Sequence, residues 1–138
     1  GDNFGISYRE FDNENGAFIF PTTTPVQFDP EAMRKTLDRL LSYNPQAVYL
    51  THFGRVTNVE KLGSDLRNCL DQLTEMALVL KQEGKAQQDS LASGVQQILR
   101  DRLRKHNCQL PESRQDELLA FDYQLNAQGI KVWLDRLD

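Results

Sequence analysis

Long apolar runs and an excess of basic residues are both missing from this sequence of 138 residues. No segment approaches the roughly 18 consecutive apolar residues that a membrane span needs. The 16 Lys and Arg are outnumbered by 20 Asp and Glu, and the resulting net charge of −4 disfavours a nucleic-acid-binding surface. The first residues lack the charged-then-apolar pattern of an export signal. We therefore expect a protein with neither a membrane nor a nucleic acid as partner, and the reduced thiols expected below indicate a cytoplasmic one.

Cysteine is scarce, with only Cys69 and Cys108 present. Neither belongs to a spaced metal-binding motif such as Cys-x-x-Cys. Cys69 falls on an apolar helical face with Leu66, Leu70 and Leu73, where a free cysteine behaves as a small hydrophobic residue. Cys108 lies in a polar connection without the neighbouring base or cation that activates a nucleophile. The sequence thus predicts two reduced thiols, with Cys69 in the core.

Short apolar runs separated by turn residues make up the beginning of the chain. Residues 4–11 and 17–20 are predicted to be strands, with a reversal at the Asn-Gly step of Asn15 and Gly16. The next apolar run, residues 47–51, is apolar on consecutive positions, as a strand covered on both faces would be. A helix is expected before it, because Asp29 can cap free amide groups and Pro30 suits the first helical position.

Helical periodicity dominates after Thr57. A long helix is predicted from Asn58 to Gly84, a second from about Ala86 to Lys105, and a third from about Glu112 onward, either continuous or broken at Gly129. The order strand, helix, strand followed by helices predicts a helix-rich α+β protein. The predicted organisation is one unit over residues 1–56 and a helical appendage over residues 57–138.

Two residues are candidates for chemistry. His52 follows the apolar run at the entry to a glycine loop, a place where metal sites and clefts are commonly built. On the residues alone, a packed histidine that donates to a backbone carbonyl is the more frequent interpretation. Asp2 by itself would be expected to be solvated, and His106, next to a basic run, would interact with a helix dipole.

Five segments together resemble the second half of metallo-β-lactamase-fold hydrolases of the glyoxalase-II type. They are residues 1–5 (GDNFG), 20–25 (FPTTTP), 28–32 (FDPEA), 48–54 (VYLTHFG) and 122–134 (DYQLNAQGIKVWL). The resemblance implies the second half of an αββα sandwich followed by a C-terminal helical appendage. It also implies that Asp2 bridges two divalent metals and that His52 binds one of them. Zinc is the metal expected first, with iron or manganese as alternatives.

The motif His-x-His-x-Asp-His, which supplies most ligands in that family, does not occur here. Two ligands cannot assemble a two-metal site that lowers the pKa of a bridging water. The chain alone is therefore expected to bind metal weakly or not at all. Tyr8 and Arg9 are candidate contacts to a small-molecule substrate, and Arg102 and Lys105 share an Arg-x-x-Lys spacing that suits either a ligand or a solvated basic face.

The sequence-based hypothesis is a C-terminal fragment of a hydrolase that uses a metal-bound hydroxide on an ester, thioester or related bond, inactive alone. The alternative is a helical protein-interaction module without catalysis. Because half of a sandwich would leave an apolar sheet face uncovered, a homodimer or domain swap through that face is also predicted.

Overall fold

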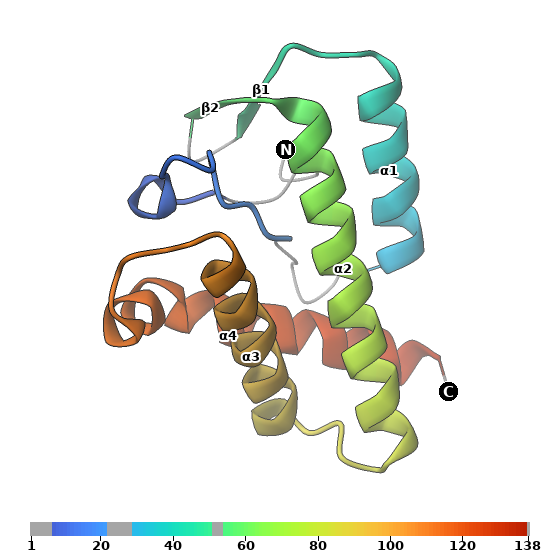
Figure 1. Cartoon of the computed structure of the whole chain (residues 1–138). Coiled ribbons are helices and arrows are strands. Elements are labelled where there is room, and N and C mark those ends of the chain that lie inside the picture. The colour runs from blue at the N-terminus through green and yellow to red at the C-terminus, as the bar shows by residue number, and fades with distance from the viewer. Residues whose placement is uncertain (1–6, 22–28, 51–53, 138) are drawn as a thin grey trace.

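Four α-helices carry most of the structure, a computed structural model that describes residues 7–21, 29–50 and 54–137 (Figure 1). A 3₁₀ turn over Arg9–Phe11 precedes them. The remaining elements, in chain order, are α1 (Pro30–Ser42), β1 (Ala47–Leu50), β2 (Gly54–Thr57), α2 (Val59–Gln82), α3 (Gln88–Lys105) and α4 (Glu112–Arg136).

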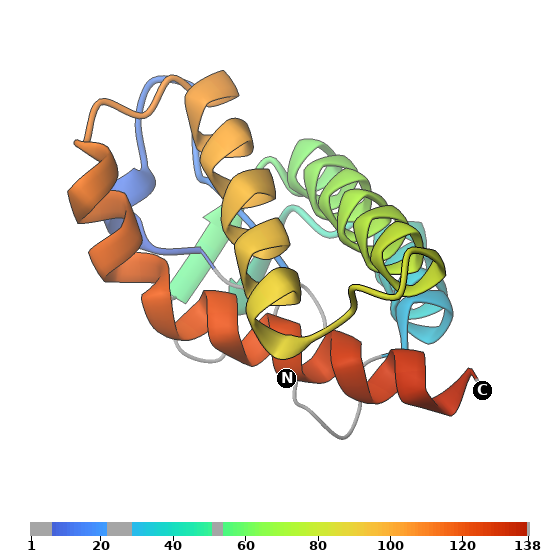
Figure 2. The same ribbon diagram turned by 90° about the horizontal axis from the view of Figure 1, so that it is seen from below.

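The larger core lies between α2, α3 and α4. Helix α3 runs back along α2 after a turn at Gly84, whose φ of 70° favours glycine, and α4 crosses both helices (Figures 1 and 2). Cys69 is fully buried in this core, which confirms its predicted place, and burial raises the pKa of its thiol to about 12. Other buried side chains of this core come from α2 and α3, among them Leu70, Leu73, Ala77, Leu91, Val95, Leu99 and Leu103, and from α4, among them Leu119, Ala127 and Ile130.

Helix α1 packs on α2 over a second, smaller apolar cluster. Its predicted start is confirmed, because the Asp29 carboxylate accepts a hydrogen bond from the Ala32 amide at 3.1 Å and Pro30 occupies the first turn. Gly63 allows the close approach, since a Cβ placed there would lie 2.7 Å from Leu41 Cδ1. The buried side chain that α1 contributes is Leu37.

The segment over residues 7–21 lies between the two clusters rather than in a sheet. Phe18 and Phe20 enter the larger core, whereas Ile19 enters the smaller one. This alternation is the pattern of a strand buried on both faces, which explains the strand prediction for residues 17–20. Among the described residues the segment forms no strand, and its bridge between Asn13 and Gly16 is a single pair at the predicted turn.

The predicted α+β sandwich is wrong, because the described part of the chain is a helical protein. Its paired strands are β1 and β2, a two-stranded antiparallel ribbon in which Ala47 is opposite Thr57 and Leu50 is opposite Gly54. The strand at residues 47–50 was predicted, but as a central strand of a larger sheet, and its partner at 54–57 was predicted as a loop. Helix α4 is continuous through Gly129.

The two-stranded ribbon also removes the basis for one predicted interface. The homodimer or domain swap was predicted to form through the uncovered apolar face of a larger sheet. The described residues form no such sheet, so this assembly stays a prediction without that surface. None of the described helices is long and apolar enough to cross a membrane.

Candidate anion-binding cleft

A cleft of about 380 Å³ lies where the 7–21 segment meets α2 and the end of α3. Its walls combine basic side chains with polar and apolar ones from these three parts of the chain. The lining residues are Asn15, Ala17, Phe18, Ile19, Lys61, Asp65, Gln72, Arg102, Lys105 and His106.

Helical spacing brings the polar lining residues onto one surface. Lys61, Asp65 and Gln72 follow one another on α2 at intervals of four and seven residues, which keeps them on the same face. On α3, Arg102 and Lys105 are three residues apart and also share a face. Because α3 runs back along α2, its C-terminal basic turn lies beside the N-terminal half of α2 (Figure 1).

Arg102 is the most distinctive group in the cleft. Its Nη1 donates to Gln72 Oε1 at 2.8 Å and its Nη2 donates to the Asp65 main-chain carbonyl at 2.8 Å. Its Nε–H is buried without a hydrogen-bond acceptor, and no carboxylate pairs with the guanidinium among the residues that the structure describes. Neutral oxygens therefore position this cation, and none of the described carboxylates forms an ion pair with it.

The other two cations of the cleft are paired at its rim. Lys61 Nζ lies 3.0 Å from Asp65 Oδ2, and Lys105 Nζ lies 3.1 Å from Asp101 Oδ2. Both pairs are solvent-exposed i,i+4 contacts, which hold their partners weakly. With three cations and one carboxylate among its lining residues, the cleft is locally positive in a chain whose net charge is −4.

His106 closes one end of the cleft and ties it to the 7–21 segment. Its Nε2 is 2.9 Å from the Phe11 carbonyl oxygen, so the ring donates there, and it packs against Phe18 with centroids 5.6 Å apart. Its own carbonyl accepts from Asn13 Nδ2 at 2.9 Å and from Asn15 Nδ2 at 3.0 Å. The imidazole is thus a structural group of the wall, at the helix end predicted for it.

The residues predicted as metal ligands, Asp2 and His52, lie outside the described residues. Within the described ranges, no group of three His, Cys, Asp or Glu side chains could hold a metal ion. The two divalent metals and the hydrolytic reaction expected from them therefore stay untested predictions for this chain.

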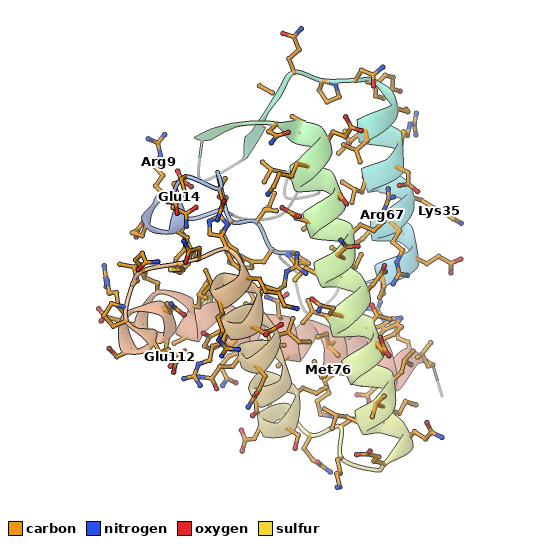
Figure 3. The ribbon with its side chains drawn as sticks, in the orientation of Figure 1. Arg9, Glu14, Lys35, Arg67, Met76 and Glu112 are labelled. Carbon is orange, nitrogen blue, oxygen red and sulfur yellow. The ribbon has the colours of Figure 1, made fainter. Side chains whose placement is uncertain are left out.

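Tyr8 and Arg9, the predicted substrate contacts, do not line this cleft. The Tyr8 hydroxyl donates to Asp122 Oδ2 on α4 at 2.6 Å, and burial, followed by this carboxylate, raises the Tyr8 pKa. Asp122 is itself buried, and the loss of solvation raises its pKa. Arg9 is exposed and points away from the helices (Figure 3). Their proposed role in substrate binding stays a prediction.

Only some of the residues that line the cleft could be predicted from the sequence. The Arg-x-x-Lys spacing of Arg102 and Lys105 was recognised, whereas Lys61 and Gln72 were not. Their helical spacing on α2 was visible in the sequence, but it gains meaning only when α3 is known to run back beside α2. The contribution of the 7–21 segment had no sequence signal, since it depends on contacts between residues more than 90 positions apart.

Comparisons with family models, with curated proteins and with solved structures gave no match to this chain. The resemblance to metallo-β-lactamase-fold hydrolases is therefore corrected. No family model supports it, and the helical fold lacks, over the described residues, the sheet that it required. Of its five segments, residues 122–134 lie in α4 and residues 30–32 in α1, whereas residues 1–5 and most of residues 20–25 lie outside the described residues.

Proposed function

We propose that this chain is a helical binding module whose cleft receives an anionic group of a ligand. The observation that carries the proposal is Arg102, a guanidinium held in the cleft by neutral oxygens and without a carboxylate partner in the described structure. Charge-assisted hydrogen bonds between arginine and a carboxylate or phosphate are about twice as strong as neutral ones. An anion in the cleft would form an ion pair with the Arg102 guanidinium, which has no such partner among the described residues.

The surroundings favour an anion over a cation or a neutral ligand. Lys105 can turn from its weak rim pair with Asp101 toward a ligand, since an exposed ion pair contributes only about 0–1 kcal/mol. Asp65, the carboxylate among the lining residues, stays paired with Lys61, while its main-chain carbonyl accepts from Arg102. The apolar wall of Phe18 and Ile19 excludes water from one side and strengthens the electrostatic attraction.

The test is a titration with inorganic phosphate, followed by amide chemical shifts at constant ionic strength. We expect saturable shifts around the cleft, which a matched sodium chloride titration does not produce. The Arg102→Gln variant should weaken binding about 10- to 100-fold, because a hydrogen bond to a charged group contributes about 1.5–3 kcal/mol.

Arg104→Gln is the matched control for this experiment. It removes the same charge from the same helix, but Arg104 is exposed, pairs with Asp101 at 3.4 Å and does not line the cleft. Phosphate affinity should be nearly unchanged in this variant. Equal losses in the two variants, or no saturable shift in the native chain, would show that the cleft is not an anion site. Melting temperatures confirm that each variant is folded.

This proposal keeps the view of the chain as a non-catalytic module of helices. It assigns that module a specific recognition element instead of a general apolar surface. A cytoplasmic location belongs to the same proposal, because both cysteines are free thiols and reducing compartments preserve such thiols.

A further inference from the structure

An apolar groove of about 430 Å³ runs between α2 and α3 beyond the basic cleft. Met76 lies in it between the two helices (Figure 3), and its Sδ would be 2.6 Å from a Cβ placed on Gly94. The absence of a side chain at Gly94 therefore makes room for the Met76 thioether, which lies against α3 and forms part of the groove floor. The residues that line it are Gln72, Glu75, Met76, Val79, Leu80, Gly94, Gln97 and Ile98.

The groove and the cleft are parts of one surface. Gln72 lines both, and its side-chain oxygen accepts from Arg102 Nη1. Met76 and Val79 extend the face of α2 that carries Gln72, and on α3 Ile98 lies one turn before Arg102. The α2–α3 seam is thus basic at one end and apolar along the rest.

The length of this seam limits what can fill it. Asp65 and Val79 are fourteen residues apart on α2, which corresponds to about 21 Å at the helical rise of about 1.5 Å per residue. A single phosphate or a small metabolite would cover only the basic end. A helix of about four turns matches the whole seam, and an apolar groove between two helices is a common receptor for such helices.

The edge of the groove favours a peptide over a lipid tail. Gln72, Glu75 and Gln97 border it with polar groups that can hydrogen-bond to the polar face of a peptide helix, whereas an acyl chain offers them no partner. Val79 is 46% exposed, so the groove is an open surface rather than an enclosed tunnel. A peptide helix can bury apolar side chains in the groove and keep polar ones toward this border.

We propose that the α2–α3 seam binds an amphipathic helix of a partner protein, with apolar side chains in the groove and an acidic residue of its first turn at Arg102. The acidic residue is placed in the first turn of the partner helix because the helix dipole favours a carboxylate there. This inference rests on the proposed anion site and identifies the source of the anion as a protein carboxylate.

The test uses two fluorescent model peptides of about 16 residues, each with a leucine stripe at helical spacing. One begins with Asp-Glu and the other with Asn-Gln, and binding is followed by fluorescence anisotropy at physiological salt. We expect the acidic peptide to bind at least about tenfold more tightly, which corresponds to about 1.4 kcal/mol. Arg102→Gln should remove this preference.

Adjacent residues of α2 supply a matched pair of variants. Val79 lines the groove and Leu78 does not, although their exposed fractions are similar, at 46% and 43%. Val79→Glu should reduce peptide affinity at least about tenfold, whereas Leu78→Glu should leave it nearly unchanged. Both variants should bind inorganic phosphate like the native chain, so a failure of the helix proposal is distinguishable from a failure of the anion site.

Several results would overturn the helix proposal. These are binding of neither peptide, equal losses for Val79→Glu and Leu78→Glu, or preferential binding of palmitate that Val79→Glu abolishes. Concentration-dependent dimerisation that only Val79→Glu prevents, measured by sedimentation, would assign the groove to a second copy of the chain instead.

Discussion

The helices α2 to α4 and the segment over residues 7–21 share one core but are organised by opposite principles. The helices satisfy their backbone groups locally and bury periodic apolar faces. The segment has a 3₁₀ turn and an isolated bridge between Asn13 and Gly16, and it is positioned by side chains that contact α3 and α4. Regular structure is therefore not required for a segment to be part of the core.

The two regions also attach differently to the same helix. On α4, Asp116 forms an ion pair with Arg100 of α3 and accepts from the Tyr123 hydroxyl at 2.9 Å. Two turns further along, the buried Asp122 accepts from Tyr8 of the segment, a neutral donor. The helix–helix contact is an ion pair that is half-exposed, whereas in the contact of the segment a buried carboxylate accepts from a phenolic hydroxyl. Opposite effects on carboxylate titration follow from this difference.

The largest expected effect concerns whether the segment is energetically part of the core. Phe20 is fully buried, so Phe20→Ala should lower the free energy of unfolding by about 3–5 kcal/mol through lost apolar contacts and the cavity left behind. Leu91→Ala in the helical core should cost a comparable amount, about 2–5 kcal/mol. Urea denaturation followed by circular dichroism measures both values.

Phe121→Ala is the control for the aromatic substitution. Phe121 is 74% exposed on α4, and its loss should change stability by no more than about 0.5 kcal/mol. Suppose that Phe20→Ala changed the free energy of unfolding as little as this control, while Leu91→Ala still lowered it by several kcal/mol. The segment would then lie on the helical core without stabilising it, and it would not be part of the same core.

The same contrast explains what the sequence could predict. The start of α1 was predictable because Asp29 and Pro30 are local signals, and α2 and α3 were predictable because apolar residues recur at helical spacing. The segment was misjudged because alternation of Phe18, Ile19 and Phe20 indicates burial on two faces without indicating what covers them. Helices cover them here, where a sheet was expected.

The candidate cleft was predictable only in part for the same reason. Arg102 and Lys105 share a helix, so their proximity is a local property. Gln72 and the Asp65 carbonyl, which hold Arg102, come from another helix, and no local pattern pairs α2 with that face of α3. The resemblance placed the chemistry at Asp2 and His52, whereas the cations that line the cleft are Lys61, Arg102 and Lys105.

An intermediate effect is expected in the pH dependence of stability. Burial raises the folded-state pKa of Asp122 above its ordinary value of 3.8, so its favourable contribution is present below that value and is lost as pH rises through the raised pKa. The hydrogen bond from the Arg100 guanidinium lowers the pKa of Asp116, so its contribution is present above 3.8 and is lost as pH falls.

The two Asp→Asn variants should therefore diverge in opposite directions. Asp122→Asn should gain stability relative to the native chain as pH rises from about 3 to 7, because asparagine can accept from Tyr8 without a buried charge. Asp116→Asn should be less stable at neutral pH, with a difference that shrinks as pH falls. Urea denaturation across this range measures both slopes, and slopes of the same sign would refute the contrast between the two attachments.

The smallest expected effect concerns the contact between the segment and the end of α3. Asn13→Ala removes the hydrogen bonds from Nδ2 to the carbonyls of His106 and Asn107, at 2.9 and 3.3 Å. Because Asn15 still donates to the His106 carbonyl, that acceptor keeps a partner and the loss should be about 0.5–1.5 kcal/mol. Gln109→Ala is the control, since its side chain bonds only to Asn107, two residues away, and it should change stability by less than about 0.5 kcal/mol.

The double variant makes this last prediction specific to the shared carbonyl. When Asn13 and Asn15 are both replaced by alanine, the His106 carbonyl loses both side-chain donors, so the loss should exceed the sum of the two single losses by about 0.5 kcal/mol or more. Hydrogen exchange should then accelerate in the last turn of α3, next to Arg102 and Lys105. Strict additivity, with unchanged exchange in that turn, would mean that the segment lines the cleft without stabilising the last turn of α3, which carries Arg102 and Lys105.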